Sequence, residues 1–106
     1  MESLTGRASN ELDRLYGKLE EDVTEYAAIC DRAARARADY KLAFATAFLK
    51  AEGSMDMRRA EADAKTYVYL REREIAEAIE KSSRAALQGL SDMMGAVRSV
   101  MANTRV

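Results

Sequence analysis

A single interruption near the middle of the chain divides two long stretches of helical periodicity. It is Ala51-Glu52-Gly53-Ser54, in a chain of 106 residues that contains no proline. Glycine readily adopts the left-handed backbone conformation that ends a helix, and a serine side chain can accept a hydrogen bond from the first free amides of the next helix. The sequence therefore predicts a helical hairpin whose two arms are nearly equal in length.

The first arm is expected to be a helix over residues 9–51, with Ser9 or Asn10 as its N-cap, after a flexible lead of residues 1–8. Its apolar residues recur at alternating steps of four and three, a spacing typical of a helix packed along its length on another helix. This seam comprises Leu12, Tyr16, Leu19, Val23, Tyr26, Cys30, Ala33, Arg37, Tyr40, Phe44, Ala47 and Ala51, and it is widened by neighbours that include Leu15, Ile29 and Phe48.

The second arm is expected to be a helix over 55–101, after a turn at 52–54 and before a frayed tail at 103–106, so that the domain covers 9–102. Its seam includes Ile75, Ile79 and Leu90. A further apolar edge lies where charged residues are scarce and consists of Leu87, Met93, Met94, Val97 and Met101. Methionine-rich faces adapt well to partner helices, so this edge is either core or a docking site for another protein.

The distribution of charge favours antiparallel arms. Residues 1–31 carry −5 and residues 32–51 carry +4, whereas residues 52–80 carry −3 and residues 81–106 carry +3. Folding about Gly53 places blocks of opposite sign side by side, and a parallel arrangement would bring like charges closer. The same folding predicts that Tyr40 lies opposite Tyr67.

Two helices alone enclose almost no interior, and a chain of this size is marginal even as a compact globule. The apolar stripe is also wider than one partner helix would cover. We therefore expect an all-α fold: a long antiparallel, coiled-coil-like hairpin that associates into a homodimeric four-helix bundle or a larger helical oligomer.

Catalytic chemistry finds little support in the sequence. Histidine is absent, which removes the commonest general base and the usual zinc ligand. Glu74, Glu77 and Glu80 stand three apart, but the glutamate–histidine pairing of carboxylate metal sites is missing. The lone Cys30 is either a small buried hydrophobe or a redox group. We expect no enzyme activity and no catalytic, cofactor-binding or metal-binding residues.

A basic segment offers an alternative function. Arg32, Arg35 and Lys41 flank Tyr40, and such a mixture can contact phosphates and stack on bases. The same residues can instead form the solvated flank of a helix whose partner is acidic. Arg37, the one charge on the first seam, is expected to set the register of the hairpin by pairing with Asp63 or Glu72.

Nothing in the sequence points to a membrane. The longest apolar run, residues 42–49, is far shorter than the roughly 20 residues of a spanning helix, and the first ten residues lack the apolar core of a signal peptide. A single cysteine favours a reducing compartment.

Three segments together resemble a known group of proteins. They are residues 38–41 (Ala-Asp-Tyr-Lys), residues 48–54 (Phe-Leu-Lys-Ala-Glu-Gly-Ser) and residues 73–82 (Arg-Glu-Ile-Ala-Glu-Ala-Ile-Glu-Lys-Ser). Their order and spacing are similar to those of small helical proteins of tailed bacteriophages and prophages, often encoded beside DNA-replication and recombination genes. The resemblance covers about residues 30–102 and implies a phage origin and the bacterial host cytoplasm. It assigns no activity.

Two functional hypotheses follow. The first is a non-enzymatic phage oligomer that acts as a protein–protein interaction module on a host or phage protein. The second is a nucleic-acid-binding accessory protein of phage recombination or replication, although Ser91-Asp92-Met93-Met94 replaces the more basic stretch of the resembling proteins.

Overall fold

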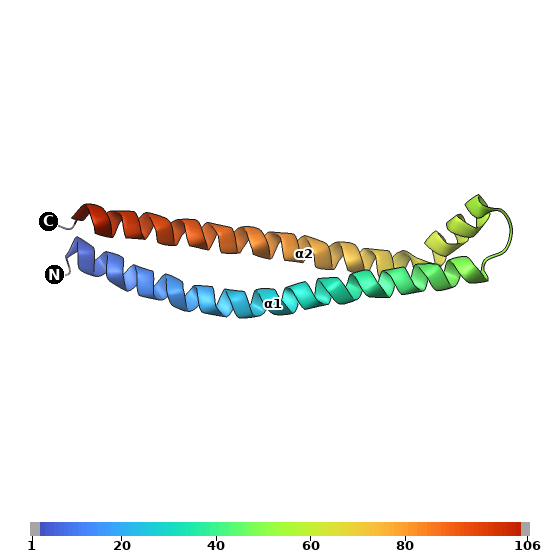
Figure 1. Cartoon of the computed structure of the whole chain (residues 1–106), viewed down its shortest axis with the longest axis horizontal. Coiled ribbons are helices and arrows are strands. Elements are labelled where there is room, and N and C mark those ends of the chain that lie inside the picture. Colours follow the sequence, from blue (N-terminus) through green and yellow to red (C-terminus); the bar gives the residue numbers. More distant parts are fainter. Residues whose placement is uncertain (1–2, 105–106) are drawn as a thin grey trace. The chain divides into compact units, whose positions relative to one another are not determined.

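The computed structural model describes residues 3–104. It contains two α-helices, α1 over Leu4–Lys50 and α2 over Met55–Thr104, joined by a short turn (Figure 1). The all-α class predicted from the sequence is confirmed. Within the described residues, neither helix has an apolar stretch long enough to cross a membrane.

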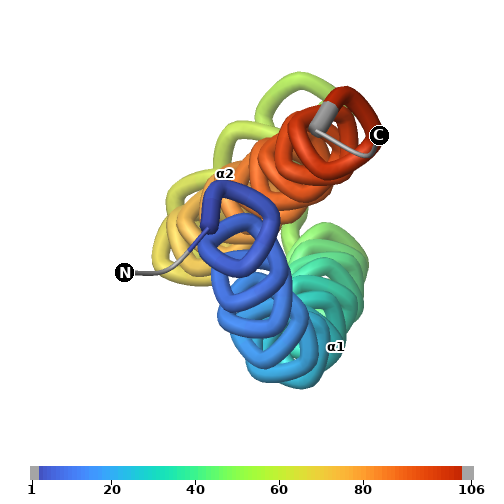
Figure 2. Tube along the Cα trace, turned by 90° about the vertical axis from the view of Figure 1, so that its left-hand side faces the viewer, coloured from blue at the N-terminus to red at the C-terminus, as the bar shows by residue number. Residues whose placement is uncertain are grey.

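The chain divides into two compact units. The turn unit is Ala28–Lys81, which contains the second half of α1, the turn and the first half of α2. The terminal unit comprises the described parts of Met1–Ala27 and Ser82–Val106. In each unit a segment of α1 lies beside a segment of α2 that runs in the opposite direction (Figures 1 and 2). The antiparallel arrangement that the charge blocks predict is therefore present in both units.

The turn is built as the sequence predicts. Gly53 lies in the turn after Lys50, the last residue of α1, and has a φ of 105°, a backbone conformation that glycine adopts readily. The Met57 amide donates to Ser54 Oγ at 3.3 Å, and the Arg58 amide donates to the Ser54 carbonyl at 2.9 Å. Ser54 is therefore the N-cap of α2, because its side chain satisfies one of the amides that the first helical turn leaves free.

The helix ends differ from the expected bounds. α1 begins at Leu4 instead of residue 9, because Ser3 provides an earlier cap. The Gly6 amide donates to Ser3 Oγ at 3.0 Å and the Arg7 amide donates to the Ser3 carbonyl at 3.0 Å. α2 continues through Thr104, so only residues 105 and 106 of the expected tail, like residues 1 and 2 of the expected lead, lie outside the described residues.

The core of the terminal unit is a small cluster of large apolar side chains. Leu15, Leu90 and Met94 are 1%, 6% and 3% exposed, and Leu12, Leu19 and Val97 pack against them. Met94 thus belongs to the interior between the helices. The sequence left open whether the second apolar edge is core or a docking site, and Met94 is part of the core.

The structure shifts one half of the predicted α1 seam by a single residue. Leu12, Leu19 and Ala33 face inward as expected, but the intervening inward positions are Leu15 and Ile29. Tyr16 and Val23, which the seam prediction placed there, are 44% and 51% exposed. The predicted set with Tyr16 and the observed set with Leu15 both fit a heptad spacing. We call these the two packing phases of α1; the structure has the phase that buries aliphatic side chains and leaves the tyrosine hydroxyl at the edge.

Aromatic side chains of α1 meet arginines of α2 in each unit. In the terminal unit, Arg98 Nη2 donates to Tyr16 Oη at 2.8 Å and Arg84 Nε donates to Tyr26 Oη at 3.1 Å. These bonds explain why both tyrosines lie at the edge of the interface, with their hydroxyl groups directed to charged donors.

In the turn unit the arginines lie over aromatic rings. The Arg58 guanidinium is 4.6 Å from the Phe48 ring centroid, and Arg73 is 4.7 Å from that of Tyr40. Arg58 Nη2 also donates to the Phe48 carbonyl at 3.2 Å, which supplies a partner to one of the last carbonyls of α1. The expectation that Tyr40 lies opposite Tyr67 is wrong: Tyr67 is 63% exposed, and Arg73 occupies the place across from Tyr40.

Candidate interaction surface

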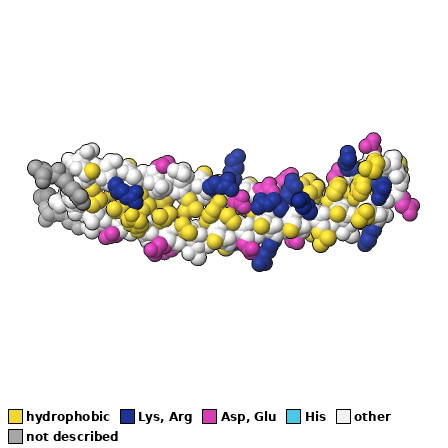
Figure 3. Space-filling model, viewed as in Figure 1, with side chains coloured by type: hydrophobic (Ala, Val, Ile, Leu, Met, Phe, Trp, Pro, Cys, Tyr) yellow, Lys and Arg dark blue, Asp and Glu magenta, His cyan; other side chains and the backbone are white. Residues whose placement is uncertain are grey.

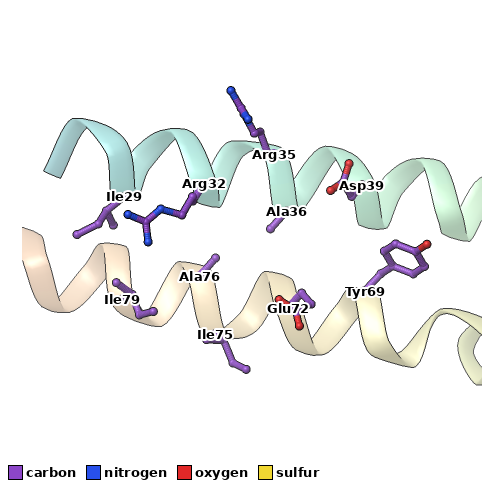
Figure 4. A pocket seen from close by; sticks show the side chains of 10 residues that line it. All are labelled: Ile29, Arg32, Arg35, Ala36, Asp39, Tyr69, Glu72, Ile75, Ala76 and Ile79. Atoms are coloured by element: carbon purple, nitrogen blue, oxygen red, sulfur yellow. The ribbon is translucent and has the colours of Figure 1, made fainter. Parts of the chain in front are cut away.

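One side of the turn unit is hollowed into a groove of about 400 Å³ between α1 and α2 (Figure 4). Both helices contribute apolar and charged side chains to it. The residues that line this groove are Ile29, Arg32, Arg35, Ala36, Asp39, Tyr69, Glu72, Ile75, Ala76 and Ile79.

The hollow forms because the helices present small side chains to each other there. Ala36 of α1 and Ala76 of α2 lie across from one another, and a methyl group fills little of the space between two helices (Figure 4). Larger apolar groups stand around them. Ile29 is 8% exposed, whereas Ile75 and Ile79 remain 47% and 46% exposed. The groove is therefore an apolar surface that the hairpin itself leaves open.

The charged side chains of the groove balance each other. Arg32 and Arg35 come from one stretch of α1, Asp39 follows on the same helix, and Glu72 comes from α2. The Arg35 Nε lies 3.0 Å from an oxygen of Asp31, an exposed pair within the helix. Two arginines and two carboxylates thus belong to the lining and leave it without net charge, although the Arg35 side chain points away from α2 (Figure 4).

The other side of the turn unit carries charged contacts between the two helices. Arg37 lies 3.6 Å from a Glu77 oxygen and 3.7 Å from a Glu80 oxygen, and Arg73 covers the Tyr40 ring. The sequence predicted a cross-hairpin partner for Arg37, but Asp63 and Glu72 were the wrong choices. Both choices assumed that the numbers of residues facing each other across the hairpin add up to about the chain length, which places Arg37 opposite position 69. The observed partners, Glu77 and Glu80, lie about two to three helical turns beyond that position on α2.

Further apolar side chains are exposed outside the groove. At the turn, Leu49, Met55 and Met57 are 75%, 58% and 64% exposed. In the terminal unit, Met93 and Val100 are 51% and 40% exposed. Figure 3 shows apolar side chains along the visible face of both units, bordered by charged groups.

The residues predicted to form an oligomer seam fall into two groups. One group is at least partly buried between the helices and consists of Leu12, Leu19, Tyr26, Tyr40, Phe44, Phe48 and Leu90. The other group is exposed and consists of Tyr16, Val23, Ile75 and Ile79. The structure brings Ile75 and Ile79 together in the groove, and these two residues are the members of the predicted seam best placed to meet another molecule there.

The predicted partner-binding residues are also divided. Met94 is buried in the core of the terminal unit, while Leu87, Val97 and Met101 are half-buried. Met93 is the member of this set with a largely exposed side chain. A docking role for the whole set would require Met94 to leave the core.

The predicted nucleic-acid residues do not form one basic surface. Arg32 and Arg35 line the groove together with Asp39 and Glu72, and Lys41 is exposed but lies outside the groove lining. Carboxylates among the arginines weaken the attraction for a phosphate backbone, since binding strength follows the local positive charge.

The described residues offer little further chemistry outside the groove. Residues 3–104 hold no group of three or more Cys, Asp or Glu side chains arranged to bind a metal ion. Cys30 is a free, half-buried thiol beside Ile29 on α1. In the terminal unit, the Arg14 hydrogen bond lowers the pKa of the exposed Glu11 carboxyl, which is not a groove residue.

Five groove residues were not singled out from the sequence as site residues: Ala36, Asp39, Tyr69, Glu72 and Ala76. Alanine by itself predicts only a good helix, and which alanines face each other becomes known only with the axial offset between the helices. Comparison of the chain with protein-family models, with curated proteins and with solved structures finds no match. The groove therefore has to be interpreted from its own chemistry.

Proposed function

We propose that this chain is a non-enzymatic interaction module, which uses the exposed apolar surface of its helical hairpin to associate with other helices, first with copies of itself. A phage origin, suggested by the sequence resemblance, would make a host or phage protein the final partner. The groove with Ile75 and Ile79 and the exposed Met93 are the surfaces available for such contacts.

The balance between buried and exposed apolar groups carries the proposal. Among the described residues, the buried apolar side chains larger than alanine are Leu15, Ile29, Leu90 and Met94, whereas fourteen large apolar side chains are at least 40% exposed. Burial of apolar surface is the main driving force of folding and association, and apolar side chains that gather in an exposed groove mark a site where another surface can bind. Association supplies that burial, as in a four-helix bundle.

Multi-angle light scattering after gel filtration tests the proposal. The unmodified chain is expected to elute with at least twice the 11.8 kDa mass of one chain at micromolar concentration. A single monomeric species across a wide range of concentrations would contradict it.

Nucleic-acid binding is a second candidate, favoured by the exposed pair Arg32 and Arg35 on adjacent turns of α1. In that case DNA should be retained at about 50 mM salt and released steeply as salt rises. Replacing Arg32, Arg35 and Lys41 with alanine should abolish this retention. An unmodified chain that retains no DNA at the low salt concentration would end this alternative.

A further inference from the structure

The two sides of the turn unit differ in how they are finished. On one side Arg37 reaches Glu77 and Glu80 of α2, so the charged groups at that side find partners within the chain. On the other side the groove leaves Ile75 and Ile79 nearly half exposed. The side with the groove is therefore open and apolar, and it offers a defined place for association.

The open side is suited to receive another helical surface. Its floor is made of Ala36 and Ala76, which allow close approach, and its walls are isoleucines and Tyr69, which supply apolar contact area (Figure 4). Helices approach most closely where small side chains lie in the contact, and neighbouring large side chains then fill the space around them.

The charged residues of the groove indicate what kind of surface can bind there. Arg32 and Arg35 carry two positive charges, the second of them already paired with Asp31 of the same helix, and Asp39 and Glu72 carry two negative charges. A strongly acidic partner would meet two carboxylates, and a strongly basic one would meet two arginines. A partner with the same mixture of both signs can match it. A two-fold dimer brings the patch against its own copy, so the surface that meets Arg32 and Arg35 also holds Asp39 and Glu72.

We infer that this groove is the surface on which a second copy of the chain docks, groove against groove. The arginines Arg32 and Arg35 of one copy then lie against the carboxylates Asp39 and Glu72 of the other, around the shared apolar floor. This inference rests on the proposed function, because it specifies which part of the hairpin makes the self-association.

Two charge-reversed variants test the inference without assuming how the copies are oriented. In the acidic variant, Arg32→Glu and Arg35→Glu make every groove charge negative; in the basic variant, Asp39→Lys and Glu72→Lys make every groove charge positive. Each variant alone brings like charges together and should raise the dimer dissociation constant about 10-fold or more. An equal mixture of the two should restore the dimer, because opposite charges then meet.

A matched control separates groove contacts from net charge. Lys41→Glu with Arg71→Glu changes the charge as much as the acidic variant does, but neither residue lines the groove. This control should dimerise like the unmodified chain. Native mass spectrometry identifies the mixed species by mass, and circular dichroism reports helix content. If a variant loses helix when alone, its recovery on mixing still shows docking through the reversed charges.

The outcomes distinguish the inference from the proposed function. A monomeric unmodified chain would contradict self-association itself, and would leave the groove to a helix of a different protein. A dimeric unmodified chain whose acidic and basic variants dimerise equally well would overturn the inference alone. The inference alone would also be overturned if a mixture of the acidic and basic variants contained no more heterodimer than random pairing of the two chains gives.

Discussion

The guanidinium of Arg73 lies over the ring of Tyr40, with its central carbon 4.7 Å from the ring centroid. This contact joins α2 to α1 on the side of the turn unit where Arg37 lies near Glu77 and Glu80. An arginine over an aromatic face is attracted by the ring quadrupole, and its aliphatic stem covers apolar surface.

A double-mutant cycle should detect this contact. Tyr40→Leu and Arg73→Met should show a coupling of about 0.5–1 kcal/mol in the free energy of unfolding. Urea unfolding at one fixed protein concentration gives the four values needed. Tyr40→Phe is the control, since it keeps the ring face and should keep the coupling. Additive effects of the two substitutions would show that the ring and guanidinium do not interact.

Gly53→Ala should destabilise the hairpin. A φ of 105° is strained for any residue with a Cβ, and that Cβ would lie 3.3 Å from Met57 Sδ. We expect a loss of about 1 kcal/mol or more, which thermal unfolding followed by circular dichroism would reveal as a lower midpoint. Gly17→Ala is a suitable comparison, because Gly17 is helical and its added Cβ meets open space. That change should stabilise by up to about 1 kcal/mol. Equal midpoints for the two variants would contradict the turn assignment.

The packing phase of α1 can be tested with two truncations. Leu15 is 1% exposed in the terminal core, whereas Val23 is 51% exposed. Leu15→Ala should cost about 2–4 kcal/mol through lost burial and the cavity left behind, and Val23→Ala about 1 kcal/mol or less. Chemical unfolding at matched protein concentration compares them. A larger loss at Val23 would show that the phase first predicted from the sequence is the one that packs.

The two-helix architecture could be predicted from the sequence because its determinants are local. Gly53 and Ser54 carry the conformational and hydrogen-bonding preferences of a helix end and a helix start, and the lack of proline leaves both arms uninterrupted. The order of the charge blocks was sufficient to predict the antiparallel arrangement. The earlier start of α1 was missed because Ser3 and Ser9 are both good caps, and only the three-dimensional structure shows which one is used.

Local sequence signals could not predict which residues of α1 face α2, nor could they predict the groove. Leu15 and Tyr16 are adjacent, and either of them fits the heptad spacing. The Arg98 side chain, far along the chain, donates to the tyrosine hydroxyl and so favours the arrangement that leaves Tyr16 at the edge. The partners of Arg37 depend on the axial offset between the helices, which no local pattern encodes. The groove arises from two alanines that face each other, and each alone predicts only a good helix.

Solvent access to Ile75 tests most directly the claim that association covers the groove. Ile75→Cys in a Cys30→Ser background places one thiol in the groove, and Leu42→Cys in the same background places one on an exposed position outside it. Reaction with a small thiol reagent is followed at about 1 µM and about 200 µM chain, a range over which mass action favours assembly. The account predicts that the thiol at position 75 reacts several-fold more slowly at the higher concentration while the thiol at position 42 does not change. Equal rates for the groove thiol at both concentrations, in a chain that is a dimer at the higher one, would contradict it.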